Sequence, residues 1–168
     1  MITVADVKTV IARPKTLVAP MAWAKKLNHT DPVWCVCRSA LQYEDDPTET
    51  PEGLYIIGQW KRRDGVKPEV WEFGMHHGQD RIYAIDIQPL AFHTNRVGEG
   101  RPFFHRRIRG MHEHTWSDEG YGYVEALGLD PADGASAWNQ FVMCAGIVDT
   151  SFIHPDRAIN DGQQELGL

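Results

Sequence analysis

A chain of 168 residues, 42% of them hydrophobic, can bury a core of its own and leaves little room for a second domain. Its formal charge of −6 disfavours a protein that coats nucleic acid, because such proteins use a broad cationic surface to displace phosphate counterions. No apolar run approaches the roughly 20 residues that cross a bilayer, and no charged leader precedes an apolar core. We expect a cytoplasmic protein without a membrane partner, with one domain over 1–150 and a flexible tail over 151–168.

The first expected element is a short helix near the N-terminus. Thr3 followed by Asp6 three residues later has the spacing of a capping box, which predicts a helix to about Ala12. Two prolines then interrupt the pattern, and a second helical turn is expected over Met21–Leu27.

Extended segments follow, rich in residues that favour strands. Tyr83, Ile85 and Ile87 alternate with polar or small residues, which is the two-residue period of a half-buried strand. The turn sequence HHGQD between the last two segments predicts a hairpin, and an acidic, proline-bearing stretch over 43–53 predicts a loop. We expect an antiparallel meander of four strands, at 33–41, 54–62, 70–75 and 81–90.

The remaining elements are a fifth strand and a helix. The stretches FFHRRIR and HEHTW predict a single strand that is broken or bulged around Gly110. After Asp130-Pro131, apolar residues recur at helical spacing, which predicts a helix across one face of the sheet. These residues are Ala137, Phe141, Cys144 and Val148. The fold class is therefore expected to be α+β, with an antiparallel sheet, a C-terminal helix on one face and a short N-terminal helix.

Cysteines and tryptophans are expected to be structural. The three cysteines lack the spacing of a zinc finger, and Cys35 and Cys37 alternate along one strand, so we expect buried thiols on a shared face. Trp34, Trp60 and Trp71 fall on separate strands and are expected to fill the core or its rim, since a platform that stacks bases would need them exposed together.

Four of the eight histidines lie between residues 91 and 116, together with five arginines. His112 and His114 are two residues apart in an extended segment, so they should share a face with Cα atoms roughly 6 to 7 Å apart. Two neutral imidazoles suit a divalent transition metal such as zinc, but a third ligand has to come from elsewhere in the fold. We expect His93 first and His105 second, whereas Glu113 should point to the opposite face.

The same residues also fit chemistry without a metal. Two histidines that titrate near neutral pH can act as general base and general acid in the cleavage of a phosphodiester. Arg107 and Arg109 alternate with His105, and their guanidinium groups match phosphate oxygens. A polar, solvated sheet surface, with the arginines paired to some of the 23 acidic residues, is the third interpretation.

These motifs resemble an uncharacterised family of small bacterial and phage-associated proteins. The resemblance covers about 33–147 and rests on H-x-N at His93–Asn95, H-x-H at His112–His114, and a helix that carries Phe141 and Cys144. The turn after Asn95 departs from the family pattern, as does Ala145–Gly146. The resemblance implies that His93, Asn95, His112 and His114 form one site, and it implies no particular activity.

Two functions follow from these observations. The first is a histidine-centred site that hydrolyses a phosphodiester or a nucleotide, with His93, His112 and His114 as catalytic or metal-binding residues, and with Asn95, Arg107 and Arg109 contacting the substrate. The alternative is a non-catalytic, anti-CRISPR-like inhibitor that binds a basic host defence complex. Its surface would be the acidic stretch of Glu44, Asp45, Asp46, Glu49 and Glu52.

Overall fold

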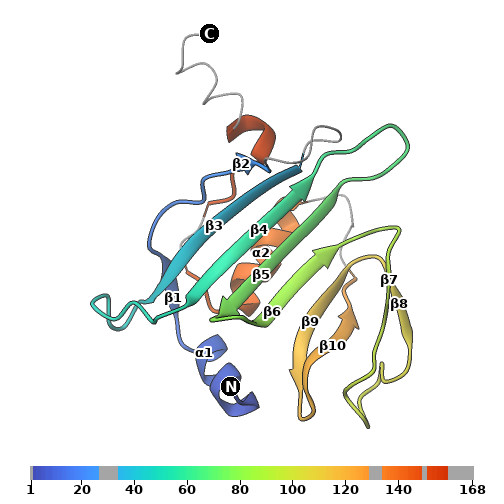
Figure 1. Cartoon of the computed structure of the whole chain (residues 1–168), viewed down its shortest axis with the longest axis horizontal. Helices are drawn as coiled ribbons and strands as arrows, with labels where there is room; N and C mark the ends of the chain where they lie inside the picture. Colours follow the sequence, from blue (N-terminus) through green and yellow to red (C-terminus); the bar gives the residue numbers. More distant parts are fainter. Residues whose placement is uncertain (1, 27–33, 129–133, 149–150, 159–168) are drawn as a thin grey trace.

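The computed structural model describes residues 2–26, 34–128, 134–148 and 151–158, and is an antiparallel sheet with a helix near each end (Figure 1). The elements are α1 (Val4–Ala12), β1 (Lys15–Leu17), β2 (Ala24–Lys25), β3 (Trp34–Tyr43), β4 (Leu54–Lys61), β5 (Val70–His77), β6 (Asp80–Ile87), β7 (Phe92–Thr94), β8 (Arg107–Arg109), β9 (His112–Ser117), β10 (Gly120–Ala126) and α2 (Gly134–Cys144). The α+β class expected from the sequence is confirmed.

The N-terminal helix begins and ends where the sequence predicts. The Asp6 backbone N–H donates to the Thr3 side chain, and the Thr3 N–H donates to the Asp6 carboxylate, which completes the capping box. The helical turn expected over Met21–Leu27 is wrong in its described part. Ala24 and Lys25 form β2 instead, because their backbone pairs with β3 rather than within the segment.

The main sheet has the strand order β1-β3-β4-β5-β6-β9-β10, with β2 also paired to β3. The meander from β3 to β6 is confirmed, and every neighbouring pair in it is antiparallel. After β6 the chain leaves the sheet, forms the separate two-stranded ribbon β7–β8, and returns as β9 beside β6. The main sheet therefore places residues 84–86 next to residues 112–114, with more than twenty residues of chain between them.

The expected single fifth strand over FFHRRIR and HEHTW is wrong. Its first part contributes β8 to the ribbon and its second part is β9 of the main sheet. Gly110 separates them with a φ of 83°, a left-handed conformation that glycine adopts without strain. β10, which the sequence reading left out, pairs with β9 and forms the last strand of the sheet.

Helix α2 covers one face of the sheet, and the opposite face is open towards the viewer in Figure 1. Phe73 contacts both Trp138 and Phe141 of α2, with ring centroids 5.3 and 6.0 Å apart. Burial of such large aromatic side chains supplies much of the free energy that holds a helix on a sheet. The covered face therefore contains the core, and polar side chains are left for the open face.

The cysteines of β3 and the predicted tryptophans lie in or beside this core. Cys35 and Cys37 are buried free thiols, as expected. Trp60 and Trp71 are buried in the core with their ring centroids 5.7 Å apart. Trp34 is half-buried on the open face, where the ammonium groups of Lys26 and Lys61 lie over its ring.

The C-terminal part of the chain adds to the core. Helix α2 carries Ala137, Phe141 and Cys144 as predicted, whereas Val148 lies beyond its end and the expected start at Asp130-Pro131 lies outside the described residues. Of the expected tail, the described part 151–158 contains His154, whose ring centroid lies 5.2 Å from those of Trp60 and Trp71. Neither named helix is long and apolar enough to span a bilayer.

Candidate metal centre

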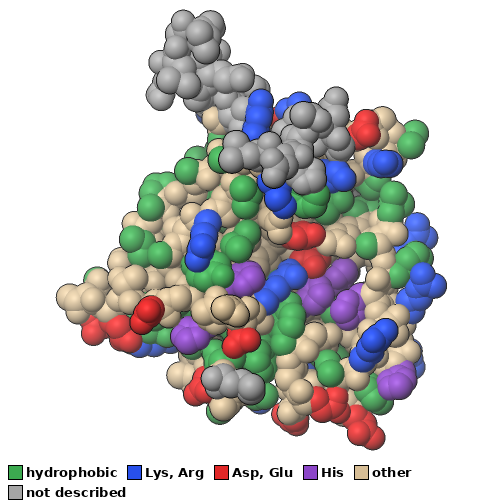
Figure 2. Space-filling model, viewed as in Figure 1, with side chains coloured by type: hydrophobic (Ala, Val, Ile, Leu, Met, Phe, Trp, Pro, Cys, Tyr) green, Lys and Arg blue, Asp and Glu red, His purple; other side chains and the backbone are tan. Residues whose placement is uncertain are grey.

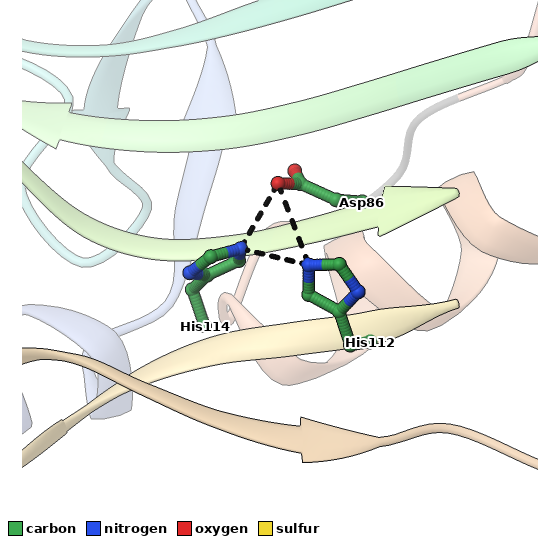
Figure 3. Close-up of side chains that lie close together, drawn as sticks. All are labelled: Asp86, His112 and His114. Atoms are coloured by element: carbon green, nitrogen blue, oxygen red, sulfur yellow. Dashed lines mark hydrogen bonds and ion pairs between the residues drawn. The ribbon is translucent and has the colours of Figure 1, made fainter. Parts of the chain in front are cut away.

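The open face carries a group of two histidines and a carboxylate that comes from the neighbouring strands β6 and β9 (Figure 3). Asp86 stands directly opposite His112 in the strand register, and Ala84 stands opposite His114. Because side chains alternate along a strand, His112, His114 and Asp86 share the open face while Tyr83 and Ile85 enter the core. Figure 2 shows histidine, acidic and basic side chains gathered in the middle of this face.

The three side chains direct their polar atoms at one point. The Nε2 atoms of His112 and His114 are 3.1 Å apart, and Asp86 Oδ2 lies 2.9 Å from His114 Nε2 and 3.9 Å from His112 Nε2. All three residues are buried, with relative exposures of 5% for Asp86, 3% for His112 and 8% for His114. Burial of a polar side chain costs free energy unless it has a partner, so the contacts among these three groups offset the cost of burying them.

A hydrogen bond to the backbone fixes which ring nitrogen of His112 faces the site. Its Nδ1 lies 2.7 Å from the Gly110 carbonyl, an acceptor, so Nδ1 carries the proton and Nε2 offers a lone pair to the site. A backbone carbonyl that holds the remote ring nitrogen in this way is common for histidines that bind metals. Burial, more than any other cause, lowers the pKa of His112, and the nearby His114 lowers it further, so this ring favours the neutral form that a metal requires.

Arg81 orients the carboxylate of Asp86. Its Nη2 donates to Asp86 Oδ1 at 2.5 Å, which leaves Oδ2 directed at the two imidazoles. Burial acts to raise the pKa of Asp86, but the hydrogen bond with His114 and the charge of Arg81 outweigh it and hold that pKa below its usual value. Asp86 is therefore an anionic oxygen donor held in one orientation.

These donors fit a divalent transition metal. Two atoms bound to zinc at about 2.0 to 2.1 Å with a tetrahedral angle lie about 3.3 Å apart, and the observed separations of 2.9 to 3.9 Å bracket that value. Two imidazoles and one carboxylate also form a donor set typical of Zn²⁺ and Fe²⁺. An ion would take the place of the proton between His114 Nε2 and Asp86 Oδ2.

Two buried polar atoms beside the group lack a hydrogen-bond partner among the described residues. They are His114 Nδ1 and the hydroxyl of Tyr121. The Tyr121 ring lies nearly parallel to that of His114, with centroids 6.0 Å apart, and burial raises the pKa of its phenol. Buried polar atoms of this kind are usually satisfied by bound water, so these two mark positions for water molecules around the group.

His93 lies next to this group. Its ring centroid is 5.2 Å from that of His114 and 6.0 Å from that of His112, so the three histidines expected to converge are brought together. Asp86, rather than His93, completes the group of donor atoms that lie within 4.8 Å of one another. Burial, followed by the charge of His114, lowers the pKa of His93, which leaves a largely neutral imidazole at the edge of the site.

Asn95 holds the ribbon that carries His93. Its amide donates to the carbonyls of Phe103 and Val124, both at 2.8 Å, and its carbonyl accepts from the Val124 N–H at 2.7 Å. The side chain thus pairs with the outer edge of β10 as another strand would. Its polar atoms are engaged by backbone groups, and its contribution to the site is to position His93.

The structure does not bring the other predicted residues to the group. His93 faces the site together with Ile108, its partner in the ribbon, so the flanking Arg107 and Arg109 project from the exposed side. Arg107 lies over the Phe92 ring, with Cζ 3.8 Å from its centroid. His105 is exposed and lies outside the strands. Glu113 accepts a hydrogen bond from Tyr83 on the core side, which confirms the orientation expected for it.

Sequence reasoning missed Asp86, Arg81 and Tyr121. Asp86 did carry a signal, because it is a carboxylate within an otherwise apolar strand, and such residues are rarely buried unless they are paired. Its partners could not be identified, because the pairing of β6 with β9 spans the β7–β8 ribbon.

Comparisons of the chain with family models, with curated proteins and with solved structures gave no match. The resemblance to small bacterial and phage-associated proteins therefore stays a prediction.

Proposed function

We propose that the chain is a metal-dependent hydrolase whose centre consists of Asp86, His112 and His114, and whose substrate is a phosphodiester or a nucleotide. The observation that carries the proposal is the convergence of one carboxylate oxygen and two Nε2 atoms within 4.8 Å on the open face. Three protein ligands leave a coordination position for water or substrate, as in catalytic zinc sites.

The surrounding residues support hydrolysis. A bound divalent ion would lower the pKa of a water molecule and stabilise negative charge on a phosphoryl oxygen. His93 is within reach of the same space and favours its neutral form, so it suits the role of general base for the attacking water. Water attack forms a new P–O bond, the bond to the leaving oxygen breaks, and that oxygen takes up a proton.

Metal analysis tests the centre itself. We expect protein purified without a histidine tag to bind about one equivalent of Zn²⁺ or Fe²⁺, measured by elemental analysis after dialysis. His114→Gln and Asp86→Asn should each weaken binding by roughly 100-fold or more, since each removes a ligand from a three-ligand site. His105→Asn is the matched control, because His105 is exposed and asparagine tolerates its φ of 58°. Wild-type protein that stays metal-free in excess Zn²⁺ and Fe²⁺ would contradict a metal centre.

Turnover tests the reaction. Metal-loaded protein should cleave bis(4-nitrophenyl) phosphate or short oligonucleotides, and a chelator should abolish this activity. The kcat of His93→Gln should be roughly 100-fold lower, because proton transfer to His93 is lost. Turnover that survives metal removal would favour acid–base chemistry by the histidines alone. Metal binding without cleavage of either substrate would refute the phosphodiesterase assignment.

The inhibitor alternative has less support from the structure. Asp45 and Glu49 of its acidic surface form ion pairs with Arg13, at 2.9 and 3.1 Å, so part of the negative charge is neutralised within the chain. Charge reversal at Glu44 and Asp46 should therefore leave the activity of the proposed hydrolase unchanged, whereas an inhibitor would lose affinity for a basic partner.

A further inference from the structure

A cavity of about 430 Å³ lies on the open face beside the candidate metal centre. It occupies the end of the sheet where β5 begins and β6 ends, between the β4–β5 connection and the segment that leaves β6 (Figure 1). Its size falls within the range of small-molecule binding sites. Its lining includes Trp34, Lys61, Lys67, Pro68, Val70 and Leu90.

The strand register places this cavity one step from the metal centre. Glu72, which lines the cavity, is the cross-strand partner of Asp86. Gln88, also in the lining, lies two residues beyond Asp86 along the chain, a spacing of about 7 Å in a strand. A molecule bound in the cavity would therefore lie against Glu72 and Gln88, the residues next to Asp86.

The lining has three basic residues, Lys61, Arg62 and Lys67, and two acidic ones, Asp64 and Glu72, a small positive balance that can hold an anion. Lys61 and Lys67 supply ammonium groups, and the carboxylate of Glu72 is already engaged by the amides of Gln59 and Gln88, at 3.0 and 2.6 Å. Asp64 is the other acidic residue in the lining, and Arg62 is paired with Asp156.

The apolar walls come from Pro68, Val70, Pro89 and Leu90, with Trp34 at one side. Leu90 is 60% exposed, which leaves an apolar surface open to solvent where a planar ring can pack. The carboxylate of Asp64 and the carbonyl oxygen of Gln88 add hydrogen-bond acceptors that the N–H groups of a heteroaromatic base can meet.

We infer that this cavity is the nucleotide-binding subsite of the chain: the base packs between Val70 and Leu90, and a phosphate binds Lys61 and Lys67. The inference rests on the proposed function, because it names the part of the substrate that is held while the adjacent centre acts. It narrows the substrate to a nucleotide and adds specificity residues that lie outside the metal ligands.

Equilibrium binding tests the subsite separately from catalysis. The probes are adenosine 5′-monophosphate and uridine 5′-monophosphate, titrated into metal-free and zinc-loaded protein, with adenosine and inorganic phosphate for comparison. We expect both nucleotides to bind more tightly than either fragment and more weakly at high salt, because the lysines contribute through charge. Failure of both nucleotides to bind at concentrations up to about 1 mM would overturn the inference.

Charge changes at the cavity wall locate the site. Leu90→Glu should weaken nucleotide binding roughly tenfold more than Leu90→Lys, because both changes remove the packing of Leu90 on the base and only glutamate adds a charge that repels the phosphate. Lys61→Gln combined with Lys67→Gln should also weaken it, while metal content stays at the wild-type level. Met143→Glu is the matched control, since Met143 is 67% exposed on α2, across the sheet. Equal affinities in both Leu90 variants would place any nucleotide elsewhere and refute the subsite.

The two proposals fail in different ways. His114→Gln should lose metal and keep nucleotide affinity in metal-free buffer, whereas the cavity variants should keep metal and lose nucleotide affinity. If the protein binds metal but no nucleotide, the metal centre is supported and the subsite is refuted. If the protein binds nucleotide at the cavity but neither binds metal nor turns over substrate, the subsite is supported and the hydrolase is refuted.

Discussion

At the scale of single residues, one buried and one half-buried imidazole make the stability of the protein depend on pH. Burial lowers the pKa of both His93 and His112 in the folded state, whereas in the unfolded chain a histidine titrates near 6.5. As pH falls below about 7, the unfolded state therefore binds protons before the folded state does. Stability must fall over this window until the folded-state pKa values are reached.

We expect the free energy of unfolding of metal-free protein, measured with urea, to fall from pH 7.5 to pH 5.5. His112→Gln should reduce this slope, because one titrating ring is lost. An unchanged slope in His112→Gln would contradict a buried neutral imidazole there. Asp86, whose pKa is lowered, contributes in a separate window: its stabilisation is present above about pH 4 and is lost as pH falls further.

At the scale of elements, the β7–β8 ribbon and its connection are tied to β9 and β10 by several side chains, and Asn95 is the most buried of those in the ribbon. Asn95 is 1% exposed and replaces a neighbouring strand for Val124 on the edge of β10. A ribbon of two short strands is not stable in isolation, so its position over the open face is set by such anchors.

Asn95→Ala should therefore lower the free energy of unfolding by about 2 to 3 kcal/mol, through the loss of three hydrogen bonds to backbone groups. It should also move the side-chain NMR signals of His93 more than those of His112, because the ring of His112 is held by Gly110. Thr94→Ala, on the exposed side of the ribbon, should change neither quantity. Stable Asn95→Ala protein with unmoved His93 signals would show that other contacts hold the ribbon.

At the scale of the whole molecule, Lys15 joins the N-terminal helix α1 to the segment that follows α2. Its ammonium group is buried and donates to the carbonyls of Val10, Ile11 and Arg13 at the end of α1. Its backbone N–H donates to the Gly146 carbonyl, beyond α2, in a parallel bridge with Ile147. One residue thus satisfies the last carbonyls of the first helix and joins it to the segment after the last.

Lys15→Met should cost about 2 to 3 kcal/mol of unfolding free energy, because it keeps the aliphatic stem and leaves buried carbonyls without their charged donor. Lys8→Met, exposed on the same helix, should stay within about 0.5 kcal/mol of wild type. The two urea unfolding curves, compared at one pH, test this. Equal stabilities would mean that water or neighbouring groups replace the ammonium.

Local pattern was sufficient for the elements whose partners are close in sequence. The capping box at Thr3 and Asp6 predicted α1, and two-residue alternation predicted the strands of the meander and the face that each side chain occupies, including the shared face of His112 and His114. These features follow from the backbone periods of 3.6 and 2 residues, which each segment expresses by itself.

Tertiary structure alone decided which segments meet. Periodicity assigns a face to Asp86, but only the pairing of β6 with β9 puts it opposite His112, and that pairing depends on the burial of apolar faces distant in sequence. The same holds for Asn95, whose partner is the edge of a strand the sequence reading left out, and for Arg107 and Arg109, which the ribbon turns outward. The histidine pair is therefore a property of the sequence, whereas the donor group it completes is a property of the fold.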